Sequence, residues 1–177
     1  MTIMQTIRHP PEHRFVPDAD NTRSLRNALG AFTTGVAVVT APTGIGPIGM
    51  TVNSFASVSL DPPLVLWSPA KSSGRHGAFT GAAHFAVHVL GVDQDALSAR
   101  FTRGGLGFEG LDWQANAEGV PVISGTIARF ECATASLHDA GDHTIVLGRV
   151  LRAAHREGEP LCFSRGAFGS FRTRHPG

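Results

Sequence analysis

Residues 36–63 read V-A-V-V-T-A-P-T-G-I-G-P-I-G-M-T-V-N-S-F-A-S-V-S-L-D-P-P, and no other stretch says as much about the architecture of this chain. The first six residues are rich in β-branched side chains and are bounded by Gly35 and Pro42, which predicts a short buried strand. A second strand is expected over residues 48–55. Because the segment between the two is rich in glycine and proline, we expect a β-hairpin.

The same segment contains a misleading motif. Gly44, Gly46 and Gly49 spell G-x-G-x-x-G, the pattern of a dinucleotide-binding turn. That turn must open a helix whose N-terminus faces a pyrophosphate, whereas here Pro47 interrupts the motif and a strand follows. We therefore interpret the three glycines as part of the hairpin.

The remainder of the chain alternates short apolar runs with turns. Further strands are expected over residues 63–67, 85–90, 127–137, 144–153 and 161–163. The 85–90 strand contains His88, which with His84 mimics a helical H-x-x-x-H motif although the residues between them alternate as in a strand.

Three helices are expected, over residues 22–34, 72–79 and 93–101, and residues 102–120 form a long loop. Asn21 or Thr22 would cap the first helix and Asp93 the third. The first helix would bury one apolar stripe, formed by Leu25, Ala28, Leu29 and Phe32.

No βαβ alternation occurs, so the predicted fold is mainly β: a closed or nearly closed antiparallel barrel with a few peripheral α-helices. Residues 1–20 have no periodicity and are expected to be an N-terminal extension, poorly ordered or draped on the body. Residues 21–171 would form the domain, and residues 172–177 a C-terminal tail.

Composition excludes several functions. The 177 residues carry 15 basic and 14 acidic side chains, a net charge of +1, which does not suit a nucleic-acid-binding protein. Two cysteines cannot build a disulfide scaffold, and they fit a reducing cytoplasm. Without an apolar run of about 18 residues or a signal peptide, we expect neither membrane insertion nor secretion.

Polar side chains gather where a strand is expected, at Thr51, Asn53, Ser54, Ser57 and Ser59. Buried without partners, each hydroxyl or amide would cost about 1 to 3 kcal/mol. Two interpretations remain open at this point: a solvated edge strand, or a wall of hydrogen-bond donors around a cofactor.

Five motifs in order make the chain recognisable: T-T-G-V-A-V-V-T at 33–40, G-M-T-V-N-S-F-A-S-V-S-L-D-P-P at 49–63, K-S-S at 71–73, F-A-V-H-V-L at 85–90 and G-D-H-T-I-V-L-G-R-V at 141–150. Over residues 24–171 the chain resembles the flavin reductase-like family, the reductase components of two-component flavin-dependent monooxygenases. The resemblance implies an antiparallel Greek-key, FMN-binding split barrel, usually a homodimer, that reduces FMN or FAD with NADH or NADPH.

The resemblance also implies a flavin site built from backbone donors, hydroxyls and a phosphate-binding cation. Phe101 would line the cofactor's outer edge, although its helical spacing equally suits the core. Lys71-Ser72-Ser73 would hold the phosphate at the start of a short helix. The alternative interpretation of this tripeptide is the capped, solvent-exposed start of a helix that binds no ligand. The flavin-binding residues implied are Thr33, Thr34, Gly35, Val36, Met50, Thr51, Val52, Asn53, Ser54, Phe55, Ala56, Ser57, Lys71, Ser72, Ser73 and Phe101.

On the nicotinamide side the resemblance points to Asp142, His143 and Phe168. His143, the implied catalytic residue, would orient the nicotinamide carboxamide or the path of the hydride, and Asp142 would hold the turn. Phe168 stands where relatives often carry tyrosine and would cover the nicotinamide pocket. Taken alone, a histidine entering a strand is more often structural.

Two functions are compatible with these residues. In the first, hydride passes from nicotinamide C4 to flavin N5 and the reduced flavin leaves for a separate monooxygenase. In the second, the protein is a non-catalytic flavin-binding or redox-sensing protein on the same barrel. A metal site at His138, Asp139, Asp142 and His143 is disfavoured because these side chains diverge on a tight turn. The sequence does not distinguish FMN from FAD as the flavin, or NADH from NADPH as the reductant.

Overall fold

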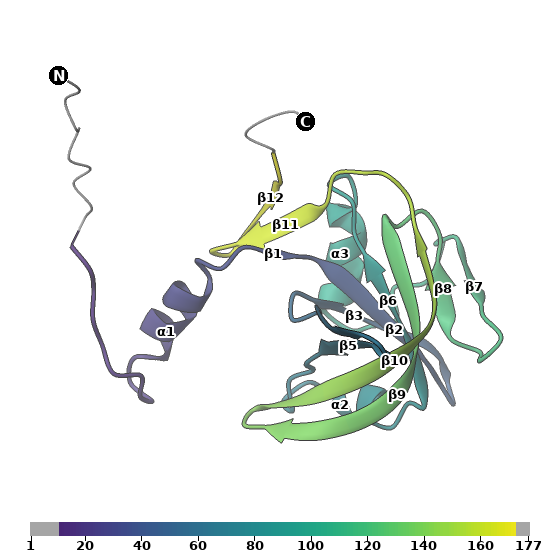
Figure 1. Ribbon diagram of the computed structural model, residues 1–177, viewed down its shortest axis with the longest axis horizontal. Coiled ribbons are helices and arrows are strands. Elements are labelled where there is room, and N and C mark those ends of the chain that lie inside the picture. Colours follow the sequence, from purple (N-terminus) through teal and green to yellow (C-terminus); the bar gives the residue numbers. More distant parts are fainter. Residues whose placement is uncertain (1–10, 173–177) are drawn as a thin grey trace.

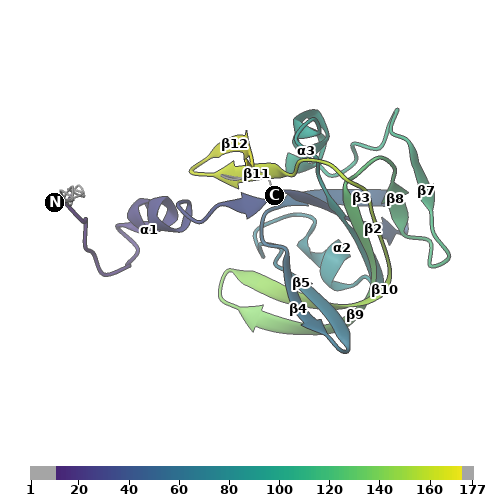
Figure 2. The same cartoon turned by 45° about the horizontal axis from the view of Figure 1, so that its top comes forward.

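The computed structural model describes residues 11–172, and its main feature is one antiparallel sheet that curls into a split barrel (Figures 1 and 2). The strands lie in the order β3-β2-β6-β9-β10-β5-β4. Their bounds are β2 (Ala37–Thr43), β3 (Gly46–Val52), β4 (Ala56–Leu60), β5 (Pro63–Trp67), β6 (His84–Val89), β9 (Ala128–Ala140) and β10 (His143–His155). The predicted mainly β, antiparallel split barrel is therefore confirmed.

Smaller elements surround this sheet. A three-stranded sheet contains β1 (Thr34–Gly35), β11 (Leu161–Ser164) and β12 (Ala167–Ser170), and a hairpin is formed by β7 (Trp113–Ala115) and β8 (Pro121–Ile123). The helices are α1 (Thr22–Leu29), α2 (His76–Thr80) and α3 (Asp95–Thr102). No helix of residues 11–172 is long and apolar enough to cross a membrane.

Strand β2 is buried on both faces and takes part in two cores. Ala37, Val39 and Ala41 face the first core, which includes Trp67 and Phe85. Val36 and Val38 precede or alternate with these residues and face the second core, formed by Leu90, Phe101, Phe108, Ile123 and Leu161. A strand that is buried on both faces does not alternate apolar and polar residues. The sequence of β2 is therefore a continuous run rich in β-branched residues.

The predicted hairpin is confirmed, although its second strand ends at Val52 rather than at residue 55, and two of its glycines have structural roles. Strands β2 and β3 pair from Ala37 with Val52 to Thr43 with Gly46. Gly46 has φ +128°, which side chains rarely adopt. At Gly49 a Cβ would lie 2.3 Å from the Phe101 ring, so α3 packs directly on the bare backbone of β3.

The first helix differs from the prediction in length and in packing. It ends at Leu29 rather than near residue 34, and none of its residues is buried. Leu29 and Phe32 of the expected inner stripe are 65% and 77% exposed. Figure 1 shows α1 projecting from the barrel. No other described element of this chain covers its apolar face.

Smaller differences occur elsewhere. Helix α2 begins at His76, several residues later than expected, and Gln94 rather than Asp93 occupies the N-cap position of α3. The loop expected over residues 102–120 contains the short strand β7, and β12 was not expected. Strands of three or four residues carry too little periodicity to be recognised.

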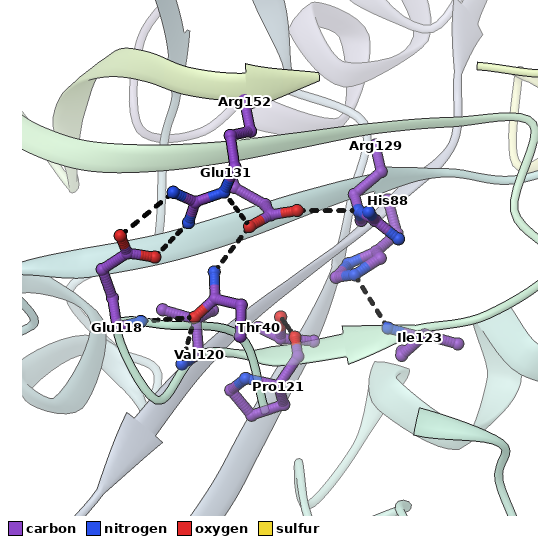
Figure 3. A network of polar contacts seen from close by, with 10 residues as sticks. Thr40, His88, Glu118, Val120, Pro121, Ile123, Arg129, Glu131 and Arg152 are labelled. Carbon is purple, nitrogen blue, oxygen red and sulfur yellow. Dashed lines mark hydrogen bonds and ion pairs between the residues drawn. The ribbon is translucent and has the colours of Figure 1, made fainter. Parts of the chain in front are cut away.

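A buried polar network joins the β7–β8 segment to the sheet (Figure 3). The side chain of Glu131 accepts hydrogen bonds from Asn116 Nδ2 at 2.7 Å and Arg152 Nε at 2.8 Å, and it lies 3.1 Å from Arg129 Nε. Burial alone would raise the pKa of Glu131, but these donors outweigh burial and lower it. The carboxylate is therefore ionised and fully engaged.

His88 belongs to the same region and is completely buried. Its Nδ1 lies 3.1 Å from the Val38 carbonyl oxygen, and its Nε2 accepts from the Ile123 N–H at 3.0 Å. These two partners require the neutral tautomer with the proton on Nδ1. Burial lowers the pKa of His88 to about 4.

Stability should therefore fall in acid. Between the ordinary histidine pKa of 6.5 and about 4, the unfolded chain binds a proton at this position that the folded chain does not. We expect the free energy of unfolding to drop by about 3 kcal/mol as the pH falls through this window.

Denaturant titrations from pH 7 to pH 4 measure this effect. His88→Gln keeps one donor and one acceptor but does not titrate, so its stability should fall less steeply over the same window. His155→Gln, at an exposed position, is the matched control and should keep the wild-type slope. Equal slopes for the wild type and His88→Gln would contradict the assignment.

Candidate functional site

The outer edge of β3 is the starting point of the site, because β3 is a terminal strand of the sheet. The Gly49 N–H points away from β2 and donates to the Gly105 carbonyl at 2.9 Å. Since backbone groups alternate in direction along an antiparallel strand, the N–H group of Thr51 points to the same outer edge, and Asn53 follows directly after the strand. This edge can therefore present backbone donors to a ligand.

Two larger cavities open beside this edge and share Asn53 and Phe163. The first, of about 650 Å³, is also lined by Arg26, Thr34 and Arg165 among others. The second, of about 220 Å³, is lined by Val36, Thr51, Val52, Asn53, Ser98, Thr102, Phe163 and Phe168. A third, of about 70 Å³, is lined by Gly35, Val36, Ala37, Phe55 and Val89.

The structure thus brings together a large part of the expected flavin-binding set. The cavities are lined by Thr34, Gly35, Val36, Thr51, Val52, Asn53 and Phe55 of that set, and by Phe168 of the expected nicotinamide set. Phe168 also packs against Phe163, with ring centroids 5.5 Å apart. These aromatic side chains give the second cavity an apolar wall.

Two hydroxyls at the cavities are buried without a partner in the described part of the chain, Thr34 Oγ1 and Ser98 Oγ. Thr34 lines the first cavity and Ser98 the second. Buried polar atoms nearly always form a hydrogen bond, and neither oxygen is exposed as it stands, so a rotation of the side chain toward the adjoining cavity would be needed to offer it to a bound molecule. An apolar wall with spare hydroxyls and edge N–H groups fits a flavin, whose flat ring has a polar rim.

Other expected flavin contacts have structural duties. Thr51 Oγ1 donates to the Ser98 carbonyl at 2.6 Å, which joins β3 to α3. Ser54 Oγ accepts from the Ser68 N–H at 3.0 Å and lies 3.4 Å from the Ser68 carbonyl, so it links the segments after β3 and β5 across the split.

Met50 and Phe101 are core residues in this structure. Met50 is 6% exposed in the first core, and Phe101 is completely buried in the second, 4.9 Å from the Phe108 ring centroid. Of the two roles open for Phe101, the structure shows packing. Thr33, Ala56 and Ser57 are exposed and are not among the residues lining the three cavities.

A second cluster joins residues that the sequence assigned to different ends of the site. The Lys71 N–H donates to the Asp142 carbonyl at 2.8 Å, and Lys71 Nζ lies 2.6 Å from Asp139 Oδ2. His143 Nδ1 lies 2.7 Å from Asp142 Oδ1. The expected phosphate-binding lysine is therefore a neighbour of Asp142 and His143, two of the three expected nicotinamide residues, and this group does not line the three cavities.

Electrostatics in this cluster follow from its pairings. A hydrogen bond from Lys71 lowers the pKa of Asp139, and one from His143 lowers the pKa of Asp142. The charge of Arg26 on α1 adds to the lowering at Asp142, so α1 and the turn before β10 face the same region. In residues 11–172 no three histidine, cysteine or acidic side chains gather as a metal site.

The expected helix start at Lys71-Ser72-Ser73 is wrong. Helix α2 begins at His76, and the Ser73 N–H donates to the Ala70 carbonyl within a turn. The N–H groups of Lys71 and Ser73 are thus already paired, and no helix N-terminus stands at this tripeptide. What remains for an anion is the Lys71 ammonium, which Asp139 already neutralises in part.

Several lining residues were not found from the sequence: Arg26, Ser98, Thr102, Phe163 and Arg165. A signal existed for Ser98, which lies between Leu97 and Phe101 on the inward side of a predicted helix, where a small polar residue is out of place. A second sequence signal existed for Arg165, because it directly precedes Gly166 in a tight turn, where arginine is uncommon.

An antiparallel split barrel with such an edge and such cavities defines a small protein that binds a flat heteroaromatic molecule. A sequence profile described as the flavin reductase like domain matches residues 29–172. The chain belongs to this family, as the five motifs predicted.

Individual relatives agree with this assignment. The chain is 72% identical over 171 residues to "FMN reductase (NADH) SmoA" of Agrobacterium fabrum, covering 97% of this chain and 98% of the relative. It is 39% identical over 153 residues to "Flavin-dependent monooxygenase, reductase subunit HsaB" of Rhodococcus jostii, covering 85% and 78%. A solved structure of the Streptomyces globisporus NADH:FAD oxidoreductase SgcE6, in complex with NAD and FAD fragments, superposes with a TM-score of 0.84 at 39% identity, covering 92% of this chain and 100% of that one.

The spare hydroxyl of Thr34 yields a direct test. Thr34→Val keeps the side-chain shape and removes a buried oxygen without a described partner, so the free energy of unfolding should stay within about 0.5 kcal/mol or rise. Flavin binding, measured by fluorescence titration, should weaken several-fold.

Thr40→Val is the matched control, because the buried Thr40 hydroxyl donates to the Pro121 carbonyl. This change should destabilise the fold by about 1 to 3 kcal/mol, as it leaves a buried acceptor unpaired. A similar loss of stability in Thr34→Val would show that its hydroxyl has a structural partner.

Proposed function

We propose that this protein reduces FMN or FAD with NADH or NADPH and supplies the reduced flavin to a separate flavin-dependent monooxygenase. The observation that carries the proposal is the pair of cavities that meet at Asn53, because hydride transfer needs two ring systems in adjoining spaces. The relatives support the substrates and the partner: SmoA is an FMN reductase that uses NADH, and HsaB is the reductase subunit of a flavin-dependent monooxygenase.

The chain's own part in this reaction is alignment and charge stabilisation. The substrates supply the redox chemistry, in which hydride passes from nicotinamide C4 to flavin N5. In our proposal Val36 and Phe163 contact the flavin ring, while the outer N–H group of Thr51 and the side chain of Asn53 stabilise the negative charge that reduction brings to the ring. No side chain is required as an obligatory acid or base.

His143 is proposed to orient the nicotinamide. A carboxylate only accepts hydrogen bonds, so Asp142 fixes the proton on Nδ1 and leaves the Nε2 lone pair for a donor such as the carboxamide N–H. The His143 side chain is 42% exposed and can be reached by a substrate. Phe168, which lines the second cavity, would cover the nicotinamide where it lies against the flavin ring, and Lys71 would exchange Asp139 for a phosphate.

The first experiment is initial-rate oxidation of NADH and of NADPH, with no flavin and with FMN, FAD or riboflavin added. We expect oxidation that depends on added flavin, which would also establish both substrate preferences. A protein that binds flavin but oxidises neither nucleotide would support the non-catalytic alternative. A protein that does neither would contradict the proposal.

The same assay tests His143. His143→Ala should bind flavin within a few-fold of the wild type but lose turnover by on the order of 10²-fold, because the nicotinamide is no longer aligned. His155→Ala, at the exposed far end of the same strand, is the control and should retain turnover. Wild-type turnover in His143→Ala would remove this role.

The protein is also proposed to act as a homodimer. Helix α1 carries apolar side chains but buries none of them within the chain, and Leu29 and Phe32 are largely exposed. Such a face usually marks an interface. A second copy of this chain is the partner we propose, because the face is continuous with the larger cavity, which Leu29 and Phe32 also line.

Light scattering tests the proposed dimer, because it measures the mass of the protein in solution directly. The wild type should have twice the mass of one chain, whereas the double change Leu29→Lys and Phe32→Lys should give monomers, since two charges would have to be buried. Ile45→Lys is the control, because Ile45 is 92% exposed at the β2–β3 turn and should leave the dimer intact. A monomeric wild type would exclude the dimer.

A cytoplasmic location is proposed as well. Cys132 and Cys162 are both free, and Cys132 is buried in the core. Unpaired thiols fit a reducing compartment.

A further inference from the structure

Two arginines face the larger cavity without an acidic partner. Arg26 lies in the last turn of α1, and Arg165 lies in the turn between β11 and β12. Neither side chain forms an ion pair or hydrogen bond within residues 11–172. The cavity lining contains no aspartate or glutamate, and Asp142, whose carboxyl feels the charge of Arg26, forms its hydrogen bond with His143 instead.

The two arginines are held together although 139 positions separate them. The Arg165 N–H donates to the Gly30 carbonyl at 2.8 Å, and Ser164 Oγ donates to the same oxygen at 3.1 Å. The β11–β12 turn is thereby fixed beside the end of α1, as Figures 1 and 2 show. The arrangement of the two residues is a property of the fold and not of two independent surface side chains.

The backbone at Arg165 has a conformation that is unusual for arginine. Ser164 pairs with Ala167, so Arg165 and Gly166 form a two-residue hairpin turn, with φ angles of +51° and +84°. Turns of this type favour asparagine, aspartate or glycine at the first position. Arginine is uncommon there, and the turn itself does not require it.

The remaining lining matches a nucleotide. Phe163 offers an aromatic face and Asn53 a polar contact, and Thr34 lies beside them. Guanidinium groups bind phosphate oxygens through two parallel hydrogen bonds. Because Asn53 also lines the second cavity, the space between the arginines adjoins the proposed flavin site.

We propose that Arg26 and Arg165 form an anion subsite that binds a phosphate group of a nucleotide substrate. The inference rests on the proposed function for the identity of that substrate. The subsite is distinct from the phosphate contact expected at Lys71, whose ammonium is paired with Asp139. The phosphate belongs either to the nicotinamide nucleotide or to the flavin.

The test uses Arg26→Gln and Arg165→Asn, singly and together. Asparagine tolerates positive φ and keeps the turn. Arg23→Gln is the matched control, because it removes the same charge from an exposed position of the same helix that does not line the cavity. Binding of NADH, FMN and riboflavin is measured by titration calorimetry, and KM and kcat are measured beside it.

Each single change should weaken the binding of one phosphate-bearing ligand about tenfold, and the double change more, while Arg23→Gln stays like the wild type. If NADH binding and its KM respond, the phosphate is that of the nicotinamide nucleotide. If FMN binding weakens and binding of riboflavin, which has no phosphate, does not, it is that of the flavin.

The subsite is overturned if the double variant binds NADH and FMN as the wild type does, or if riboflavin binding weakens as much as FMN binding. Failure of the proposed function looks different: the wild type would then oxidise no nicotinamide nucleotide with any flavin. The calorimetric comparison still decides the subsite in that case, since it needs no turnover.

Discussion

The structure depends on one constraint, the burial of β2 (Ala37–Thr43) on both faces. Ala37, Val39 and Ala41 complete the barrel interior, while Val36 and Val38 complete the core beneath α3. A polar substitution at any of these positions would leave an unpaired group in one core. Since β3 and β6 pair with the two edges of β2, its position also fixes where the sheet ends.

The site follows from where that sheet ends. The barrel is split beside β3, and only some of the polar side chains there are engaged in holding it together: Ser54 bonds to Ser68, and Thr51 bonds to α3. The hydroxyls of Thr34 and Ser98 are left over in the described structure. The distinction between engaged and spare groups is a tertiary property, and it separates the structural from the ligand-facing members of one polar cluster.

Residue patterns predicted what local physics controls. The β-branched run before Pro42 identified β2, and Pro47 excluded a dinucleotide turn, because both effects act over a few residues. These patterns could not predict packing between distant segments. The apolar stripe of α1 indicated a buried face, but it could not show that no other described part of this chain covers that face. The motifs located the region of the site, yet they could not show that Lys71 and Asp142 are hydrogen-bonded neighbours, since that depends on a contact between distant segments.

The free edge of β3 has a further consequence for how the molecule behaves in solution. Unpaired strand edges invite pairing with other chains and promote aggregation. Here the Gly49 N–H is capped by Gly105, and Ser54 is tied to Ser68, so the open window extends only over residues 50–53. Such a window admits the rim of a small ring system, but it is too short to template another strand. The fold therefore keeps this edge open for a ligand without exposing an edge long enough to pair with a strand of another chain.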